Sequence, residues 1–314
     1  MPPPEGPALA TATIVMCTFN GALFLREQLK SFCTQQGVRW RLFVSDDGST
    51  DETRKIIQQF QKSEAGRIVV DTTNGPRRGF ASNFLTALGA APESEYFALS
   101  DQDDIWLPEK LQRAISLLSL IPADRPALYC SRTTTANRQG EPVGYSELFT
   151  VKPNFKNAIV QSISGGNTMV LNLAARKLVQ QAGTHLNIVS HDWWLYQLVS
   201  GAGGAVIYDT ESHILYRQHG ENMVGENRSI GARLNRLKRL MNGVFKTWMD
   251  RNLSALDSCK ALLTVENRDL VTELTNLRRR GRLARVIGIY KLHLRRDSIL
   301  ENIGLVIAAA MGRF

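Results

Sequence analysis

The stretch LSDQDDIW, residues 99–106, places three carboxylates within four positions, directly after an apolar run that is typical of a strand. Acidic side chains crowded at a strand end repel one another, so a compensating charge is expected nearby. A divalent cation with oxygen ligands, Mg2+ or Mn2+, is one candidate, because such ions also share ligation with substrate phosphates. The alternative is a plain turn in which Asp104 caps a helix that has Pro108 in its first turn.

Outward from this stretch, apolar β-branched runs alternate with segments of helical spacing. Strand-like runs lie at 13–18, 42–45, 67–71, 96–100 and 127–131, and helix-like segments at 22–34, 52–62, 80–90 and 107–120. This alternation predicts an α/β fold, Rossmann-like, with a mostly parallel central sheet and helices on both faces. Ligands bind beyond the carboxyl ends of such strands, and residues 18–21, 46–47 and 101–104 each follow a predicted strand directly.

The second half of the chain is less regular. Strand-like runs lie at 168–171, 205–208 and 214–216, and helix-like segments at 174–182 and 192–199, followed by an arginine-rich helical pattern from residue 230. We expect one α/β domain over 1–228 and a basic helical C-terminal extension over 229–314.

Composition limits the classes of protein that this chain can be. The net charge is +9, but residues 230–314 hold 17 Lys and Arg against 7 Asp and Glu, so the rest of the chain is nearly neutral. That distribution argues against nucleic-acid binding by the body of the protein. The four cysteines form no CxxC pair, no signal peptide is recognisable, and no apolar stretch reaches the ~18 residues of a membrane span. We expect a cytoplasmic protein.

Three motifs resemble those of the family 2 glycosyltransferases with the GT-A fold. Residues 14–21 (IVMCTFNG) and 44–51 (VSDDGSTD) resemble the start of that family, and residues 100–106 resemble its DXD motif. The last is particularly similar to the form in bacterial rhamnosyltransferases of surface polysaccharide synthesis. The resemblance covers about residues 13–225. It adds the GT-A fold to the α/β frame predicted above, and it implies that the domain over 1–228 binds a nucleotide sugar and is the catalytic domain.

The first motifs point to residues that bind the donor. A carboxylate at Asp46 can accept hydrogen bonds from a uracil or thymine N–H or from ribose hydroxyls, and its family counterpart contacts the nucleobase. Thr18 and Asn20 are expected to line the nucleotide pocket, and Arg78 to lie beside the donor phosphates. The alternatives are turn-forming or capping roles, for which Asp47 fits better than Asp46, and a solvated surface arginine.

The acidic stretch points to a metal and diphosphate site. The resemblance implies that Asp103 ligates a Mg2+ or Mn2+ ion and that Asp101 contacts the ribose or a metal-bound water. His219 is expected to complete the metal shell, because imidazole accepts Mn2+ well and the family carries such a histidine on a closing loop. Arg217 is expected to pair with a donor phosphate. A lone histidine in a purely structural role is the alternative.

The stretch HDWW, residues 191–194, resembles the family motif whose aspartate is the general base, with histidine where many members have glutamate. Asp192 is therefore expected to take the proton of the acceptor hydroxyl. Trp193 and Trp194 are expected to stack on a sugar face, and the alternative is a capped helix with core tryptophans. The turn at Gly166 and Asn167 is expected to let backbone approach a sugar.

These features together predict an inverting, metal-dependent glycosyltransferase. We expect transfer of a sugar, L-rhamnose from dTDP-L-rhamnose, to a hydroxyl of a growing lipid-linked surface glycan such as O-antigen. The alternatives are a hexosyltransferase of the same family that uses a UDP-sugar and a non-catalytic protein that binds nucleotide or an anionic surface. A dinucleotide oxidoreductase is not expected, because no GxGxxG follows the first strand.

The C-terminal segment carries its own prediction. Arginines crowd residues 278–296, and the apolar run 303–311 follows them. This combination suits helices that lie on an anionic bilayer, so we expect peripheral contact with the inner face of the cell membrane. A solvated helical pair packed on the core and a homo-oligomer interface are the alternatives.

Overall fold

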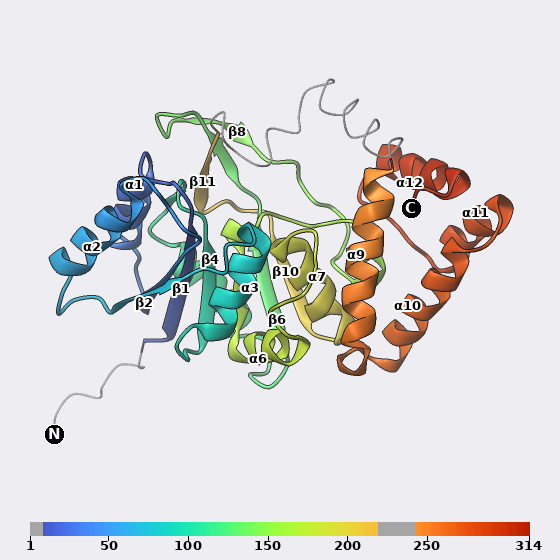
Figure 1. Ribbon diagram of the computed structural model, residues 1–314, viewed down its shortest axis with the longest axis horizontal. Helices are drawn as coiled ribbons and strands as arrows, with labels where there is room; N and C mark the ends of the chain where they lie inside the picture. Colours follow the sequence, from blue (N-terminus) through green and yellow to red (C-terminus); the bar gives the residue numbers. More distant parts are fainter. Residues whose placement is uncertain (1–8, 219–242) are drawn as a thin grey trace.

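The computed structural model describes residues 9–218 and 243–314, and a seven-stranded sheet forms its centre (Figure 1). The strands follow the order β10-β6-β9-β4-β1-β2-β3. Their bounds are β1 (Thr11–Thr18), β2 (Arg39–Asp46), β3 (Val70–Asn74), β4 (Tyr96–Ser100), β6 (Ala127–Ser131), β9 (Val170–Asn172) and β10 (Ala205–Asp209). Neighbouring strands are parallel except at β9, which runs antiparallel to β4 and β6. The predicted mostly parallel sheet is confirmed.

Helices cover both faces of this sheet because the central strands are apolar on both sides. In β1, Ile14 and Met16 join one buried cluster, and Val15 and Cys17 join the other. The first cluster lies under α1 (Leu25–Phe32), α2 (Thr53–Ser63) and α4 (Lys110–Leu118). The second lies under α3 (Phe80–Ala90), α6 (Leu173–Ala182) and α7 (His191–Gly201). This alternation is the period-two pattern of a strand buried on both faces.

A second, four-stranded sheet lies at the carboxyl ends of the main strands. Its order is β5-β11-β7-β8, with β5 (Ile105–Trp106), β11 (Ile214–Arg217), β7 (Thr134–Ala136) and β8 (Pro142–Tyr145). Strand β5 directly follows the acidic stretch, and β11 pairs with it antiparallel. Two short helical segments, α5 (Phe155–Ala158) and η1 (Gly166–Thr168), lie in the connections that follow.

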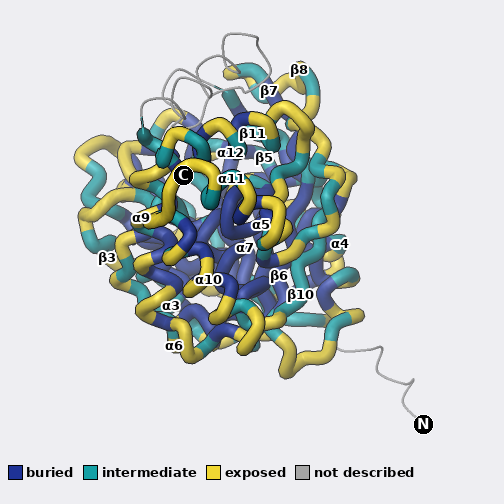
Figure 2. Tube along the Cα trace, turned by 90° about the vertical axis from the view of Figure 1, so that its right-hand side faces the viewer, coloured by how far each residue is buried: buried dark blue, intermediate teal, exposed yellow. Residues whose placement is uncertain are grey.

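The C-terminal part is helical, as predicted. It comprises α9 (Val244–Ser258), η2 (Lys260–Leu262), α10 (Val265–Arg278), α11 (Arg282–Lys291) and α12 (Ile299–Met311). The core under α3, α6 and α7 continues into these helices through Met249, Leu274 and Leu305. Figure 2 looks onto this side and shows buried chain beneath the helices. The predicted boundary at 228–229 and the predicted metal ligand His219 lie outside the described residues.

Most predicted elements are confirmed, and three details are wrong. The helix at 80–90 and the strands at 96–100 and 127–131 have the predicted bounds. Strand β3 begins only at Val70, and residues 166–168 form a 3-10 turn before β9. Asp104 is not a helix cap, because α4 begins at Lys110 and its N-cap is Glu109. Within the described residues, no helix is long and apolar enough to cross a membrane.

Candidate functional site

The parallel register brings the first two motifs together at one edge of the sheet. Thr18 ends β1 directly beside Asp46 at the end of β2, and its Oγ1 donates to Asp46 Oδ2 at 2.9 Å. Asn20 Oδ1 accepts a hydrogen bond of 2.8 Å from the backbone N–H of Thr50. The three predicted donor-binding residues on these two loops therefore lie in one cluster, because parallel strands end at a common edge.

Asp46 is buried and surrounded by donors. Its Oδ1 accepts from Ser49 N at 3.0 Å and from Arg54 Nε at 2.6 Å, and its Oδ2 accepts from the Ser49 hydroxyl. Burial raises the pKa of Asp46, but the hydrogen bonds outweigh burial and leave the pKa below its ordinary value. Asp46 is therefore an ionised acceptor at neutral pH.

The loop before α3 is held by Asp47. Its two carboxylate oxygens accept from the backbone N–H of Arg77 at 2.6 Å and of Gly79 at 3.2 Å. Arg78 lies between these two anchor points and is exposed. The turn-forming role predicted for Asp47 is thus carried out between the loop after β2 and the loop before α3. Arg78 stays at the surface beside the N-terminus of α3.

Gln102 joins the acidic stretch to the first loop. Its side-chain amide donates to Phe19 O at 3.0 Å, and its Oε1 accepts from Phe19 N at 2.8 Å. A Cβ at Gly21 would lie 2.2 Å from Gln102 Oε1, so this approach requires glycine. Gln102 is not among the residues predicted from the sequence, because its role depends on contacts with Phe19, 83 positions away in the chain.

The three acids of the stretch occupy different environments. Burial, Asp103 and Asp192 together raise the pKa of Asp101 to about 7. Asp104 is fully buried, and burial with its two acidic neighbours raises its pKa well above the ordinary value. Asn167 Nδ2 donates to Asp104 at 2.7 Å, and Arg217 N donates at 3.3 Å. The cluster therefore carries electrostatic repulsion that these neutral donors only partly offset.

Arg217 corrects one prediction. Its guanidinium is 1% exposed and donates to the backbone carbonyls of Asp103 and Arg138 and to the Glu27 carboxylate. The ring of Phe24 lies 4.6 Å from the guanidinium carbon. The predicted pairing with a donor phosphate is therefore wrong for this structure. The guanidinium is buried and donates to the backbone of the acidic stretch at Asp103.

Lys110 is a buried cation that the sequence analysis missed. Its Nζ lies 3.9 Å from the centre of the Trp106 ring and has no hydrogen-bond partner within the described part of the chain. Burial lowers the pKa of Lys110 to about 7, and the nearby Asp104 carboxylate opposes this shift. Its spacing from Ala114 and Leu118 was the available signal, since α4 packs the face that these residues share into the core.

Asp192 lies in the first turn of α7, and its side chain is partly exposed. Its Oδ1 accepts a hydrogen bond of 2.7 Å from the backbone N–H of Trp193. Its effect on the pKa of Asp101 indicates that its carboxylate lies near the acidic stretch. The fold therefore brings together two acidic motifs that are about 90 positions apart in the sequence.

The two tryptophans are core residues, so the prediction of sugar stacking is wrong. Trp193 is 5% and Trp194 0% exposed, and Trp193 Nε1 donates to Ala158 O at 2.6 Å. The alternative interpretation, a helix with core tryptophans, is correct. Gly166 lies against the ring of His191, where a Cβ would be 2.0 Å from His191 Nε2, so only glycine fits.

The residues present fit a divalent cation only with help from a substrate. Within the described residues, no group of three or more His, Cys, Asp or Glu side chains is arranged to hold a metal ion. Burial and the neighbouring acids nevertheless raise the pKa values of Asp101 and Asp104, so their charged forms are disfavoured, and a bound cation would offset that cost. Carboxylates plus substrate phosphate oxygens are a donor set that Mg2+ and Mn2+ accept.

Comparisons with known proteins agree with this architecture. The chain is 29% identical to the dTDP-rhamnosyl transferase RfbG of Shigella flexneri over 250 residues, which cover 77% of this chain and 84% of that protein. The structure of Staphylococcus aureus TarS 1–349 with UDP-GlcNAc superposes with a TM-score of 0.52 at 13% identity, covering 96% of this chain and 90% of that chain.

A second solved structure shares the fold. The mannosyltransferase PcManGT of Pyrobaculum calidifontis, solved with GDP-Man and Mn2+, superposes with a TM-score of 0.50 at 17% identity, covering 98% of this chain and 88% of that chain. The family model described as glycosyl transferase family 2 matches residues 13–171, which is half of the chain. The chain belongs to glycosyl transferase family 2, with the GT-A fold.

Proposed function

We propose that this protein is an inverting, metal-dependent glycosyltransferase that moves L-rhamnose from dTDP-L-rhamnose to a hydroxyl of a lipid-linked surface glycan. The observation that carries the proposal is the packing that places Asp192 beside the acidic stretch. The ring of the preceding residue, His191, lies against Gly166, and the next residue of that turn, Asn167, donates to Asp104, so a candidate base lies near a site for the leaving diphosphate. The similarity to a dTDP-rhamnosyl transferase over most of both chains supports the choice of donor.

In this proposal the donor lies along the carboxyl edge of β1, β2 and β4. Asp46 binds the nucleobase or ribose, with Thr18 and Asn20 beside it, and Arg78 lies next to the phosphates. Asp103 ligates the cation and Asp101 supports it. A Mg2+ or Mn2+ ion bound there would neutralise the charge that develops on the leaving diphosphate. Arg217 and Asn167 hold the acidic stretch in place from the buried side.

The reaction we propose is a single displacement. The Asp192 carboxylate accepts the proton of the acceptor hydroxyl while that oxygen forms a bond to the anomeric carbon. The bond between the anomeric carbon and the diphosphate oxygen breaks, the nucleoside diphosphate leaves, and the configuration inverts. No covalent intermediate is involved, so the mechanism needs no nucleophilic side chain.

A panel of donors tests this proposal. The full-length protein with Mn2+ is incubated with dTDP-L-rhamnose, UDP-glucose, UDP-GlcNAc and GDP-mannose, and release of each nucleoside diphosphate is measured with and without EDTA. We expect release from dTDP-L-rhamnose that EDTA abolishes. Release from a UDP-sugar alone would favour the alternative hexosyltransferase, for which the structural neighbour solved with UDP-GlcNAc is the supporting observation. No release from any donor would support a non-catalytic binder.

We also propose that the C-terminal helices lie on an anionic membrane surface and present the enzyme to its acceptor. On α11, Leu283, Ile287 and Tyr290 are exposed at helical spacing. On α12, Ile299 is exposed at the first position, and the exposed apolar residues then recur every three or four positions: Leu300, Ile303, Ile307 and Met311. Such faces are rare on proteins that meet only water, and they favour an apolar partner.

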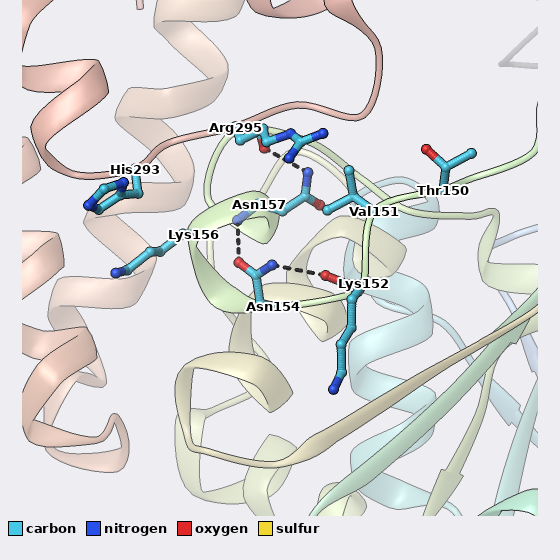
Figure 3. A pocket seen from close by; sticks show the side chains of 8 residues that line it. All are labelled: Thr150, Val151, Lys152, Asn154, Lys156, Asn157, His293 and Arg295. Carbon is cyan, nitrogen blue, oxygen red and sulfur yellow. Dashed lines mark hydrogen bonds between the residues drawn. The ribbon is translucent and has the colours of Figure 1, made fainter.

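Positive charge surrounds these faces and determines which partner fits. Exposed basic side chains flank α11: Arg279, Arg280, Arg282, Lys291 and Arg295. A cavity of about 500 Å3, seen in Figure 3, opens where the loop before α12 meets the segment before α5, and Lys152, Lys156, His293 and Arg295 line it. Each basic group near an anionic bilayer contributes ~1 kcal/mol to binding. An anionic lipid surface therefore complements this part of the protein.

A further inference from the structure

The imidazole of His191 is a buried polar group whose two ring nitrogens have no hydrogen-bond partner within the described residues. His191 begins α7 and is 4% exposed. Its ring stacks on Phe84 with 3.9 Å between centroids and meets the edge of Phe80 at 5.8 Å. A buried polar atom without a partner lowers stability, whereas an apolar ring of the same shape does not.

The two ring nitrogens of His191 therefore do not contribute to the stability of the fold. Phenylalanine would make the same stack on Phe84 without burying unpaired polar atoms. Burial lowers the pKa of His191 to about 4, although the neighbouring Asp192 opposes this shift. At neutral pH the ring is uncharged, so it offers one N–H donor and one nitrogen acceptor.

The ring lies between the two halves of the candidate site. Its Nε2 points at the backbone of Gly166, as the 2.0 Å distance to a hypothetical Cβ shows. The next residue, Asn167, holds Asp104 of the acidic stretch, and the residue after His191 is the proposed base Asp192. We therefore expect the hydrogen-bond partner of the imidazole to be a substrate group that lies between the acidic stretch and Asp192.

We infer that His191 binds a hydroxyl group of a sugar substrate through its ring nitrogens, once the backbone of Gly165 and Gly166 shifts away from the ring while Asn167 keeps its bond to Asp104. A sugar hydroxyl both donates and accepts hydrogen bonds, which matches a neutral imidazole. The hydroxyl belongs either to the transferred sugar or to the acceptor, and the chemistry is the same for both. This inference rests on the proposed glycosyl transfer.

H191F tests the inference because it keeps an aromatic ring stacked on Phe84, slightly larger than imidazole, and removes both ring nitrogens. We expect a Tm above that of the wild type by about 2–4 °C and a kcat/KM lower by about ten-fold. If the hydroxyl is on the donor, acceptor-free hydrolysis of dTDP-L-rhamnose falls as well. If it is on the acceptor, hydrolysis is unchanged and only transfer falls. If the kcat and KM of H191F both lie within two-fold of the wild-type values, the inference is overturned.

Two matched measurements separate a polar role from a packing role. F84L disturbs the same stack without removing a polar atom, and it should lower Tm while kcat/KM stays within about two-fold of the wild type. H191N and H191Q each restore a polar atom near one ring nitrogen, and at least one should recover part of the activity that H191F loses. Recovery by neither variant, with F84L as damaging to activity as H191F, would assign the ring to packing alone.

A direct measurement applies even if H191F does not fold. The chain has five histidines, so the Cε1–H resonance of His191 can be assigned by its loss in H191Q. Addition of dTDP-L-rhamnose with Mg2+, or of acceptor, should shift this resonance, and no shift with either would overturn the inference. If the wild type releases nucleoside diphosphate from no donor, it is the proposed function that fails.

Discussion

Asn167 and Asp104, which are 63 positions apart, are joined by a hydrogen bond of 2.7 Å from the amide Nδ2 to the carboxylate Oδ2. Both side chains are buried, Asn167 to 2% and Asp104 to 0% exposure. The bond ties the glycine turn to the acidic stretch. It also supplies one of the few groups that offset the repulsion inside that stretch, so its loss should be measurable in the folded state.

Removal of this donor should destabilise the protein. N167A leaves a buried carboxylate oxygen of Asp104 without its partner, and we expect the free energy of unfolding to fall by about 1–3 kcal/mol. Urea denaturation at pH 7 measures the change. N276A, at an exposed position of α10, is the control and should change stability by no more than about 0.5 kcal/mol. Equal losses in the two variants would contradict a specific role for the bond.

The base should be separable from donor binding. D192N keeps the size of the side chain but removes the proton acceptor, so kcat should fall by about 10²–10⁴. The affinity for the nucleoside diphosphate should stay unchanged, as measured by calorimetry with Mn2+. D124N makes the same substitution at an exposed aspartate that is not one of the site residues, so it should retain the wild-type kcat. A D192N variant with kcat within ten-fold of the wild type would exclude Asp192 as the base.

Removal of Arg217 should cost much more stability than removal of the charge of its partner Glu27. Arg217 is 1% exposed and Glu27 is 58% exposed. R217A leaves the Glu27 carboxylate in water, but it empties a buried site and leaves two carbonyls unpaired, so stability should fall by about 3–5 kcal/mol. E27Q keeps a side-chain acceptor for the buried guanidinium and should lower stability by about 1–2 kcal/mol. Chemical denaturation of both variants checks this, and similar losses would contradict it.

Lys110 should make stability depend on pH above neutrality. Its pKa is about 7 in the folded chain and has its ordinary value of 10.5 in the unfolded chain. Between those values the unfolded chain binds more protons, so this group makes the free energy of unfolding rise with pH over that window. K110M removes the contribution, and it should stabilise the protein more at pH 6 than at pH 9. An equal effect at both pH values would contradict the buried-lysine assignment.

The apolar faces of the C-terminal helices should control binding to lipid vesicles. L283E combined with I287E places two charges on the exposed face of α11, so sedimentation with phosphatidylglycerol vesicles should weaken about ten-fold or more. L120E, at a similarly exposed leucine two residues after α4 ends, is the control and should bind like the wild type. If the double variant leaves vesicle binding intact but abolishes a dimer in light scattering, a second copy covers this face instead.

The order of the motifs predicted the frame of the molecule well. The strand ends at Thr18, Asp46 and Asp101 lie at one edge because a parallel sheet collects carboxyl ends there. Strands were predicted near β9 and β11, but the antiparallel direction of β9 and the pairing of β11 with β5 in a small sheet were not. These short strands pair with segments far along the chain, and local sequence patterns carry little information about such pairing.

The sequence by itself determined the α/β alternation, the family and the acidic chemistry of the stretch at 101–104, because these depend on residue types at short spacing. Only the tertiary structure decided which of these side chains are buried in the core, which hold the acidic stretch, and which face the site. It placed Trp193 and Trp194 in the core, directed Arg217 to the back of the acidic stretch, and made Asp104 a buried partner of Asn167 rather than a helix cap. Burial and partners across the fold set these roles, and neither is encoded in local spacing.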